Sequence, residues 1–364
     1  MLTFHPLEVT AVDRIAEDAV CVRLALPEAL RGHFKHDAGQ YVTLRRVIDG
    51  REERRTYSIV TPPGTAELRI GVREQTGGRM SRDLATRLSP GERLEVGTPM
   101  GRFRTAVDAS RARTYVAFAA GSGITPVLSL AADILAREPA SRFTLIYGNR
   151  SMSRTMFLED TLALKNRHLG RFSVYFVMSR EPQQAALLNG RIDADKVEAL
   201  AAQFADIARA DEYFVCGPGD MVDAVRGALQ RLNPNAPVRF ERFAAAATPA
   251  ARTAAARTAA ANSAELPPGE VLAQISVVMD GRRRSFPMAP TDASVLAAAE
   301  RAGLDLPFSC RAGICATCRT KLKSGQAVMA HNIALEPWEV AAGFILCCQA
   351  RPLTASLELT YDEK

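Results

Sequence analysis

The sequence predicts a multidomain protein with an antiparallel β-barrel domain, a doubly wound α/β domain and a small α+β domain, in that order. Short runs of alternating or β-branched apolar residues, separated by Pro, Gly and Asp, fill residues 5–104 and are typical of a barrel. From Thr114 onward, strand-like and helix-like runs alternate, which indicates a parallel sheet covered by helices. A low-complexity stretch of Ala, Thr, Arg and Pro then separates the C-terminal part. We therefore predict domains at residues 1–107, 108–243 and 269–364, with a flexible linker at residues 244–268.

Hydrophobic periodicity and turn residues predict the individual elements. The barrel strands are expected at residues 19–26, 39–47, 55–60, 67–73 and 92–97. The strands of the α/β domain are expected at residues 115–120, 143–148, 174–179, 212–217 and 238–243, with helices near 126–136, 156–165 and 221–232. The last domain is expected to contain a hairpin over 274–288 with an Asp280-Gly281 turn, a helix over 294–304 and a strand over 354–359.

Composition and charge exclude several functional classes. The net charge of +6 is spread along the chain, and Arg282–Arg284 form its only tight basic cluster, which predicts a solvated surface and no nucleic-acid site. No apolar run is long enough to span a membrane, and the N-terminus lacks the basic start and apolar run of a signal peptide. We therefore expect a cytoplasmic protein.

Five of the seven cysteines are crowded toward the C-terminus, which in a cytosolic chain favours metal ligation over disulfides. The spacing Cys310-x4-Cys315-x2-Cys318, followed by a distant cysteine, is typical of a plant-type 2Fe-2S cluster, whereas zinc sites usually show paired C-x2-C knuckles. Small residues between these cysteines let backbone N–H groups approach the sulfurs. Either Cys347 or Cys348 supplies the fourth ligand, because neighbours on an extended segment point in opposite directions.

Two segments of the first domain suggest a flavin site. The segment Arg55-Thr56-Tyr57-Ser58 brings together three groups that suit a flavin. These are a guanidinium for a phosphate, an aromatic ring for the isoalloxazine and a hydroxyl near its reactive nitrogen. A pair of glycines leads into a predicted helix, whose free N–H groups suit a pyrophosphate. The expected flavin contacts are therefore Arg55, Thr56, Tyr57, Ser58, Val72, Gly78, Arg79, Met80 and Ser81.

Two turns of the second domain suggest a nicotinamide nucleotide site. A Gly-rich strand-to-helix turn supplies Gly121, Gly123, Thr125 and Pro126, with Thr125 as the expected N-cap and Pro126 as the first helical residue. A second turn, with Cys216, Gly217 and Pro218, ends another strand at the carboxyl edge, where open α/β sheets bind ligands. After the second strand of the domain, Arg150 and Ser151 stand where NAD-binding proteins often have a carboxylate, with Arg154 nearby, which favours the 2′-phosphate of NADPH.

Taken in this order, the segments RTYS, GGRMS, GSGITP, CGPGDM and the cysteine loop resemble the ferredoxin-NADP+ reductase superfamily fused to a C-terminal plant-type ferredoxin domain. The resemblance covers nearly the whole chain outside the linker. It implies a β-grasp fold for the last domain, FAD as the flavin, and Ser58 and Cys216 as catalytic residues. It also implies an aromatic contact between Phe243 and the flavin. For the 2Fe-2S cluster, it selects Cys310, Cys315, Cys318 and Cys348 as ligands.

Within this superfamily, the segments YGNR, LPFSCRAGICATC and ILCCQARP are similar to those of reductase subunits of phenylacetyl-CoA epoxidases, although a serine is more usual at Cys347. The resemblance implies that electrons pass from NADPH through FAD and the cluster to a partner oxygenase, here a di-iron component. The alternatives are a reductase of a Rieske-type oxygenase or demethylase using FMN or FAD, a stand-alone diaphorase and a redox sensor.

Overall fold

The structure is a computed structural model that describes residues 3–243 and 272–363. The described residues divide into two compact units, one over residues 4–243 and the other over residues 272–363. The linker predicted at residues 244–268 lies outside the described residues. No helix in the described part of the chain is long and apolar enough to cross a membrane.

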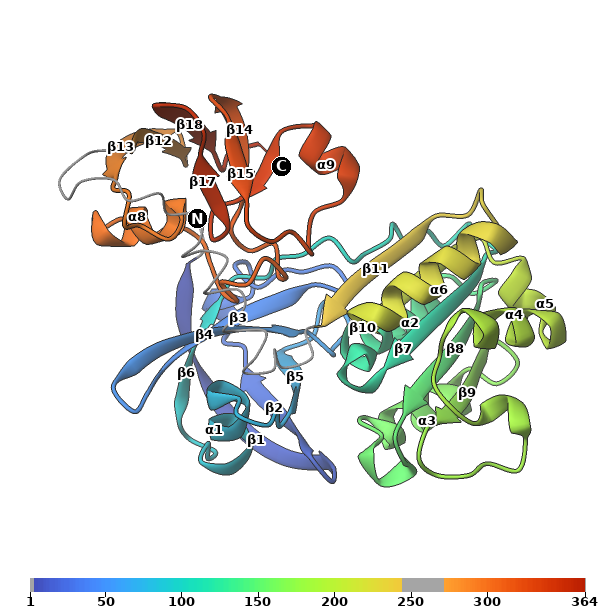
Figure 1. Cartoon of the computed structure of the whole chain (residues 1–364). Helices are drawn as coiled ribbons and strands as arrows, with labels where there is room; N and C mark the ends of the chain where they lie inside the picture. Colours follow the sequence, from blue (N-terminus) through green and yellow to red (C-terminus); the bar gives the residue numbers. More distant parts are fainter. Residues whose placement is uncertain (1–2, 244–271, 364) are drawn as a thin grey trace. The chain divides into compact units, whose positions relative to one another are not determined.

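The first domain is a six-stranded antiparallel sheet with the strand order β4-β3-β6-β1-β2-β5 (Figure 1). An isolated bridge between Ile59 and Ile70 joins the two ends of this order and closes the sheet into the predicted barrel. The sequence did not predict β1, the 13-residue strand that joins the two halves of the sheet. The strands are β1 (Phe4–Ala16), β2 (Ala19–Ala25), β3 (Tyr41–Ile48), β4 (Arg51–Ser58), β5 (Glu67–Arg73) and β6 (Arg93–Gly97).

Strand β5 contributes one face to the barrel core and the other face to the contact with the second domain. Leu68, Ile70 and Val72 are fully buried in the barrel core, together with Met80 and Leu84 of helix α1 (Arg79–Thr86). Because side chains alternate along a strand, the residues between them face outward. This outward face of β5 contacts the second domain.

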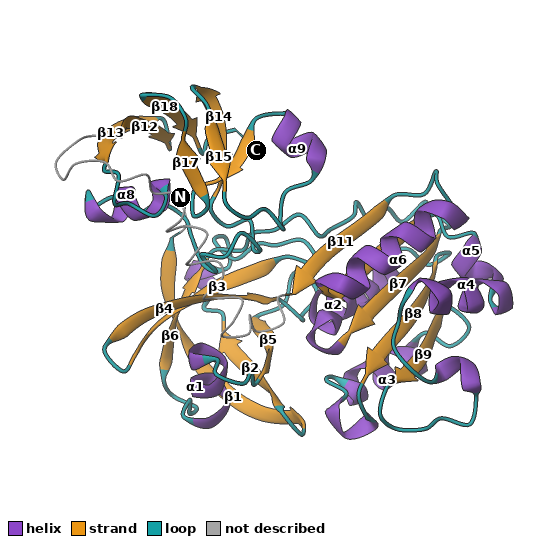
Figure 2. Cartoon of the chain, in the orientation of Figure 1, coloured by secondary structure: helices purple, strands orange, loops and turns teal. Residues whose placement is uncertain are grey.

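The second domain is a parallel sheet with the order β11-β10-β7-β8-β9 and helices on both faces (Figure 2). Helices α2 and α3 pack on one face, and α4, α5 and α6 pack on the other, so the doubly wound prediction is confirmed. The strands are β7 (Thr114–Ala120), β8 (Arg142–Asn149), β9 (Phe172–Met178), β10 (Glu212–Pro218) and β11 (Val238–Phe243). The helices are α2 (Ile124–Arg137), α3 (Leu158–Arg167), α4 (Ala194–Gln203), α5 (Ala205–Ala208) and α6 (Gly219–Leu232).

The barrel and the parallel sheet share one apolar core. A single cluster of buried residues includes Cys21 and Val60 from the barrel as well as side chains of α2 and β8. The contact is close at Gly71, where an added Cβ would lie 2.6 Å from the Phe157 ring and 2.7 Å from Thr125 Cγ2. Arg69 also forms a 2.7 Å ion pair with Asp160 across this contact. These contacts fix the position of the two domains relative to each other.

The C-terminal unit is a mixed five-stranded sheet with the order β13-β12-β18-β14-β16. The predicted hairpin and its turn are confirmed, with positive φ at both Asp280 and Gly281, as a type I′ turn requires. β13 forms one edge of the sheet, and Arg282, Arg283 and Arg284 on it are exposed. The strands are β12 (Ala273–Met279), β13 (Arg282–Met288), β14 (Arg319–Ser324), β16 (Phe344–Leu346) and β18 (Ser356–Thr360). A two-stranded sheet, β15 (Ala327–Met329) with β17 (Ala350–Pro352), and helices α8 (Val295–Arg301) and α9 (Pro337–Ala341) complete it.

Candidate functional site

Strand β4 and the start of α1 bring two guanidinium groups of the predicted flavin site together. Arg55 Nη2 lies 3.0 Å from Glu53 Oε2, and Arg79 Nε lies 3.3 Å from Glu53 Oε1. Arg55 also donates to the Arg54 carbonyl at 2.6 Å, while Arg79 donates to the Ile48 carbonyl at 2.8 Å. Both side chains remain partly exposed, so they are accessible to an anionic ligand.

The other predicted flavin residues differ in how far they are open to a ligand. Tyr57 packs partly buried against the barrel core, and burial raises the pKa of its phenol well above the ordinary value, although Arg55 opposes this shift. Ser58 is buried at the end of β4, and Thr56 is half-buried. The side chain of Val72 points into the barrel core, which leaves only its main chain for a cofactor contact.

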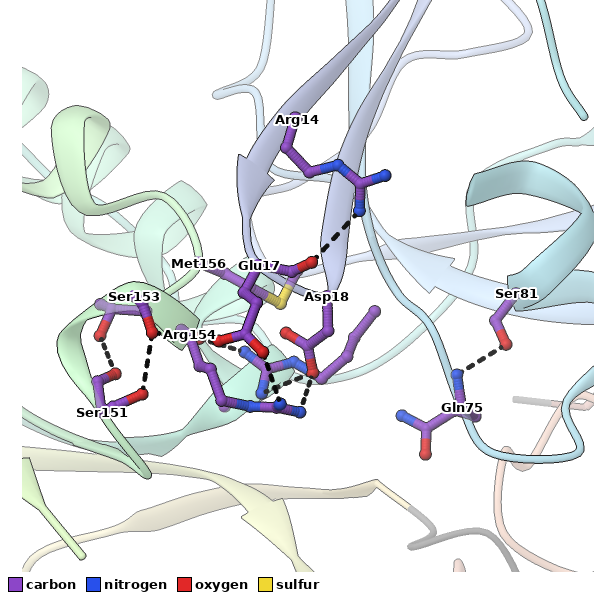
Figure 3. A network of polar contacts seen from close by, with 12 residues as sticks. Arg14, Glu17, Asp18, Gln75, Ser81, Ser151, Ser153, Arg154 and Met156 are labelled. Atoms are coloured by element: carbon purple, nitrogen blue, oxygen red, sulfur yellow. Dashed lines mark hydrogen bonds and ion pairs between the residues drawn. The ribbon is translucent and has the colours of Figure 1, made fainter. Parts of the chain in front are cut away.

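The start of α1 has the features of a phosphate-binding helix terminus. Gly78 is the N-cap residue, and no side chain caps the first-turn N–H groups. The Ser81 hydroxyl accepts a 3.1 Å hydrogen bond from the Gln75 N–H, which folds the Gly77-Gly78 turn onto the helix (Figure 3). Met80 is buried and anchors the helix to the barrel. The N–H groups and Arg79 together fit a pyrophosphate.

The two Gly-rich turns of the second domain touch each other at the switch point of the sheet. β7 and β10 are adjacent, and their following helices lie on opposite faces. A Cβ on Gly123 would lie 2.1 Å from the Cys216 carbonyl oxygen and 3.0 Å from the Gly217 nitrogen. Only glycine fits at this approach. Open α/β sheets bind nucleotides at such a switch point, beyond the carboxyl ends of the strands.

The predicted cap of α2 is wrong. Gly121–Gly123 form a short 3-10 helix that runs into α2 at Ile124, with Gly123 as the N-cap. Thr125 lies inside the first turn and donates a 2.9 Å hydrogen bond to the Ser122 carbonyl, and Pro126 follows it. The tight glycine turn already has helical geometry, so the helix begins earlier than the Thr-Pro pair suggested.

The end of β11 adds a carboxyl group that the sequence prediction left out. Glu241 is paired in register with Cys216 of β10, and its Oε2 is buried without a hydrogen-bond partner among the described residues. Burial raises its pKa to about 7. Cys216 is fully buried, and burial raises the pKa of its thiol well above the ordinary value. Phe243 ends β11 and packs partly buried against the core shared by the two domains.

The loop after β8 separates the two arginines that the sequence grouped together. Arg150 is exposed directly beyond Asn149, the last residue of β8. Arg154 instead points back to the barrel, where it is ion-paired with Asp18 and lies 3.6 Å from Glu17 (Figure 3). Ser153 reinforces this contact, because its hydroxyl donates to Glu17 Oε2 at 3.1 Å. Arg154 therefore serves the contact between the domains.

Arg73 at the end of β5 extends the same network toward the nucleotide turn. Its Nη2 donates a 2.6 Å hydrogen bond to the Arg154 carbonyl, and its Nη1 lies 3.7 Å from Asp18 Oδ2. A Cβ on Gly121 would lie 3.8 Å from Arg73 Nη1. Burial, only partly offset by Asp18, lowers the pKa of this guanidinium, but an arginine stays charged. A barrel cation is thus placed beside a turn that suits phosphates.

The predicted cluster ligands form two pairs of neighbouring thiols. Cys310 is paired with Cys315, and their contact lowers the pKa of Cys310 to about 5 and raises that of Cys315. Cys318 and Cys348 form the second pair, with the pKa of Cys348 lowered by Cys318. No group of three or more His, Cys, Asp or Glu in the described part of the chain is arranged to hold a single metal ion. Two pairs of thiolates fit a cluster of two irons.

The loop around these thiols supplies backbone N–H donors to a cysteine sulfur, as expected from the small residues between the cysteines. The N–H groups of Ala312 and Ile314 lie 3.3 and 3.5 Å from Cys310 Sγ. Gly313 has a positive φ, and a Cβ there would lie 2.7 Å from the His331 carbonyl oxygen. Such N–H donors favour a thiolate or a reduced cluster.

Cys347 and Cys348 point to different surroundings. Cys348 lies with Cys318, and the Gln349 amide is 3.7 Å from its sulfur. Cys347 is fully buried beside Tyr361, and burial raises the pKa of its thiol to about 12. This placement agrees with the assignment of Cys348 as ligand and of Cys347 as a core residue.

These three sites in one chain define a class of protein, an electron-transfer reductase with flavin, nicotinamide and iron–sulfur domains. Family models agree with this class. Residues 6–105 match the oxidoreductase FAD-binding domain, 118–227 the oxidoreductase NAD-binding domain and 277–353 the 2Fe-2S iron-sulfur cluster binding domain.

Comparisons over the whole chain make the identification more specific. The chain is 38% identical to a component of 1,2-phenylacetyl-CoA epoxidase from Escherichia coli, covering 100% of this chain and 99% of that protein. It is 30% identical to the ferredoxin reductase component of 3-ketosteroid-9-alpha-monooxygenase from Rhodococcus rhodochrous, covering 98% and 96%. The fold matches that of phthalate dioxygenase reductase with a TM-score of 0.58 at 24% identity, over 98% of both chains. The protein belongs to the family of oxygenase reductases of the ferredoxin-NADP+ reductase type that carry a C-terminal 2Fe-2S ferredoxin domain.

Proposed function

We propose that the protein is the NADPH-dependent reductase component of a di-iron oxygenase that epoxidises a CoA thioester such as phenylacetyl-CoA. The whole-chain identity of 38% to a component of phenylacetyl-CoA epoxidase carries this proposal. The four thiols support electron transfer to a separate protein, because an iron–sulfur cluster transfers electrons one at a time. A cytoplasmic location is part of the proposal, because free thiolate ligands suit a reducing compartment.

Each site has a defined part in this function. When bound, FAD would supply the chemistry that links two-electron hydride transfer to one-electron transfer. Arg55, Arg79 and the first turn of α1 would hold the flavin phosphates, while Tyr57 and Ser58 would line the ring. Gly121, Gly123 and Gly217 would allow the nucleotide backbone to approach the sheet edge.

Glu241 and Cys216 would complete the site where the two rings meet. Cys216 has a buried thiol with a high pKa, so we assign it to shaping the ring pocket and not to proton transfer. Glu241, with a pKa of about 7, would hold or release a proton near neutral pH. Phe243 would lie against the flavin from the end of the same strand.

The preference for NADPH rests on Arg150. Its exposed guanidinium follows β8, and the Arg180 N–H bonds the Arg150 carbonyl at 2.8 Å, which brings a second exposed arginine to this edge. Two cations just beyond the ends of β8 and β9 favour a 2′-phosphate. Arg150→Gln should lower kcat/KM for NADPH by about 10-fold to 100-fold and change that for NADH little. Equal losses with both nucleotides would contradict this preference.

The deciding experiment is an anaerobic titration of the purified protein with NADPH, followed by visible absorption and EPR. Bleaching of the flavin band together with a rhombic 2Fe-2S signal is expected. Flavin reduction without a cluster signal would favour a stand-alone diaphorase.

The partner is tested by turnover with purified oxygenase components. Epoxidation of phenylacetyl-CoA with a di-iron component supports the proposal. Faster electron transfer to a Rieske-type oxygenase would instead favour a reductase of that class. Slow electron transfer to every oxygenase component would favour a redox sensor.

A further inference from the structure

We propose that Glu53 is a positioning residue that makes the flavin site prefer the diphosphate of FAD over the terminal phosphate of FMN. Glu53 belongs to none of the predicted flavin motifs. The inference rests on the proposed flavin function of the barrel and adds the selectivity of that site.

Glu53 lies between the two guanidinium groups that are expected to bind phosphate. Its Oε2 is 3.0 Å from Arg55 Nη2 and its Oε1 is 3.3 Å from Arg79 Nε. The side chain of Glu53 is only 15% exposed, whereas those of Arg55 and Arg79 are 45% and 37% exposed, so solvent screens these ion pairs in part. One carboxylate thus joins strand β4 to the start of helix α1.

Both guanidinium groups are also held at a second point. Arg55 Nη1 donates to the Arg54 carbonyl, and Arg79 Nη2 donates to the Ile48 carbonyl. Each arginine is therefore fixed before a ligand arrives, and each keeps other N–H groups for a phosphate oxygen, since a guanidinium has five donors. Fixed donors reduce the entropy lost on binding.

The charge of the site follows from these contacts. Two guanidinium groups and one carboxylate leave a net charge of +1 at the centre of the site. Asp49 lies 3.6 Å from Arg79 Nη2 but is largely exposed, so it adds little. The carboxylate lies within ion-pair distance of both groups and repels a second negative charge placed between them.

The two flavins differ in how they distribute negative charge. The terminal phosphate of FMN is a monoester that carries nearly two charges on one phosphorus at neutral pH. The diphosphate of FAD carries one charge on each phosphorus, so Arg55 and the α1 terminus with Arg79 can each bind one. Glu53 penalises the concentrated charge more than the divided one.

The chain provides a matched control. Glu52 precedes Glu53 on β4 and lies 2.8 Å from Arg54, a residue outside the predicted flavin set. Adjacent residues of a strand face opposite sides. Glu52→Gln therefore removes the same charge from the same strand without touching Arg55 or Arg79.

The test is a fluorescence titration of flavin-free, full-length protein with FAD and with FMN. For Glu53→Gln, the ratio of the FMN and FAD dissociation constants should fall by about tenfold or more, while Glu52→Gln keeps the wild-type ratio. A ratio that stays within about threefold of wild type in Glu53→Gln overturns the inference.

Two further results separate the possible failures. If Glu53→Gln does not fold, Glu53→Asp keeps the charge and should keep the preference for FAD; a shift of its ratio toward FMN overturns the inference. If wild-type protein binds neither flavin, the flavin function of the barrel itself is wrong, and the inference fails with it.

Discussion

Arg154 of the nicotinamide domain is ion-paired with Asp18, at the tip of the β1–β2 hairpin of the barrel, 136 residues away in the sequence. Asp18 also lies 3.7 Å from Arg73 Nη1, so one carboxylate joins arginines from both domains. The network holds the loop after β8 against the barrel (Figure 3). Arg150, which directly follows β8, remains exposed.

Arg154→Gln should lower the free energy of unfolding and leave nucleotide selectivity unchanged. The expected loss is about 1–3 kcal/mol, because a partly buried charged hydrogen bond is removed. Chemical denaturation measures the loss, and a double-mutant cycle with Asp18→Asn isolates the pair. A large change in the NADPH/NADH ratio would show that Arg154 binds the nucleotide after all.

Gly123→Ala should impair nucleotide binding far more than Gly121→Ala. A Cβ on Gly123 would lie 2.1 Å from the Cys216 carbonyl oxygen, whereas one on Gly121 would meet nothing nearer than 3.8 Å. Gly121 has a positive φ, so its replacement costs about 1 kcal/mol of backbone strain. Calorimetric titration with NADP+, together with thermal melting, compares the two variants. Similar affinities in both would contradict the close approach of the two turns.

Glu241→Gln should flatten the dependence of stability on pH. The folded pKa of about 7 lies above the ordinary 4.5, so between these values the folded protein keeps a proton that the unfolded chain has lost. Stability is therefore full below the lower value and falls as pH rises toward 7, by up to about 3 kcal/mol. Denaturation at pH 5 and pH 8 measures the difference in wild type. An unchanged difference in the variant would assign the effect to another group.

The same substitution should alter the pH profile of flavin reduction. If Glu241 holds a proton near the nicotinamide, the neutral amide removes an ionisation near pH 7 from the rate of reduction by NADPH. Stopped-flow absorption across about pH 5.5–8.5 follows this rate. Glu212, buried in β10 and ion-paired with Arg239, provides a control carboxylate away from the turn.

Cys347→Ser should keep the iron–sulfur cluster, whereas Cys348→Ser should lose it. Cys348 is placed with Cys318, and Cys347 faces Tyr361 in the core. Iron content, visible absorption and EPR of the reduced protein report the cluster directly. A cluster that survives in Cys348→Ser and disappears in Cys347→Ser would reverse the ligand assignment.

The sequence predicted most of the fold because periodicity and turn residues agree in most elements. It missed β1 because that strand buries only Leu7 and Val9 fully, so its alternation is weak. The cap of α2 was placed at Thr125 because a Thr-Pro pair usually begins a helix, whereas the Gly-Ser-Gly turn here is already helical.

The sequence could predict those parts of the candidate site that lie within one short segment. It could not predict those that depend on contacts between residues far apart in the sequence. The cysteine spacing and the RTYS segment can be recognised from neighbouring residues alone. Nothing in the sequence indicates that Arg154 forms an ion pair with Asp18, or that Glu53 forms ion pairs with both Arg55 and Arg79. Glu241 gains its character from burial against β10, which only the register of the sheet reveals.

The arginines of β13 have a consequence for how the C-terminal domain behaves at high concentration. Among the described residues, β13 is the edge strand of its sheet, and an unpaired edge can pair with the edge of another molecule and start aggregation. Three successive exposed arginines make such pairing between two copies bring like charges face to face. We therefore expect the only tight basic cluster of the sequence to disfavour self-association through this edge.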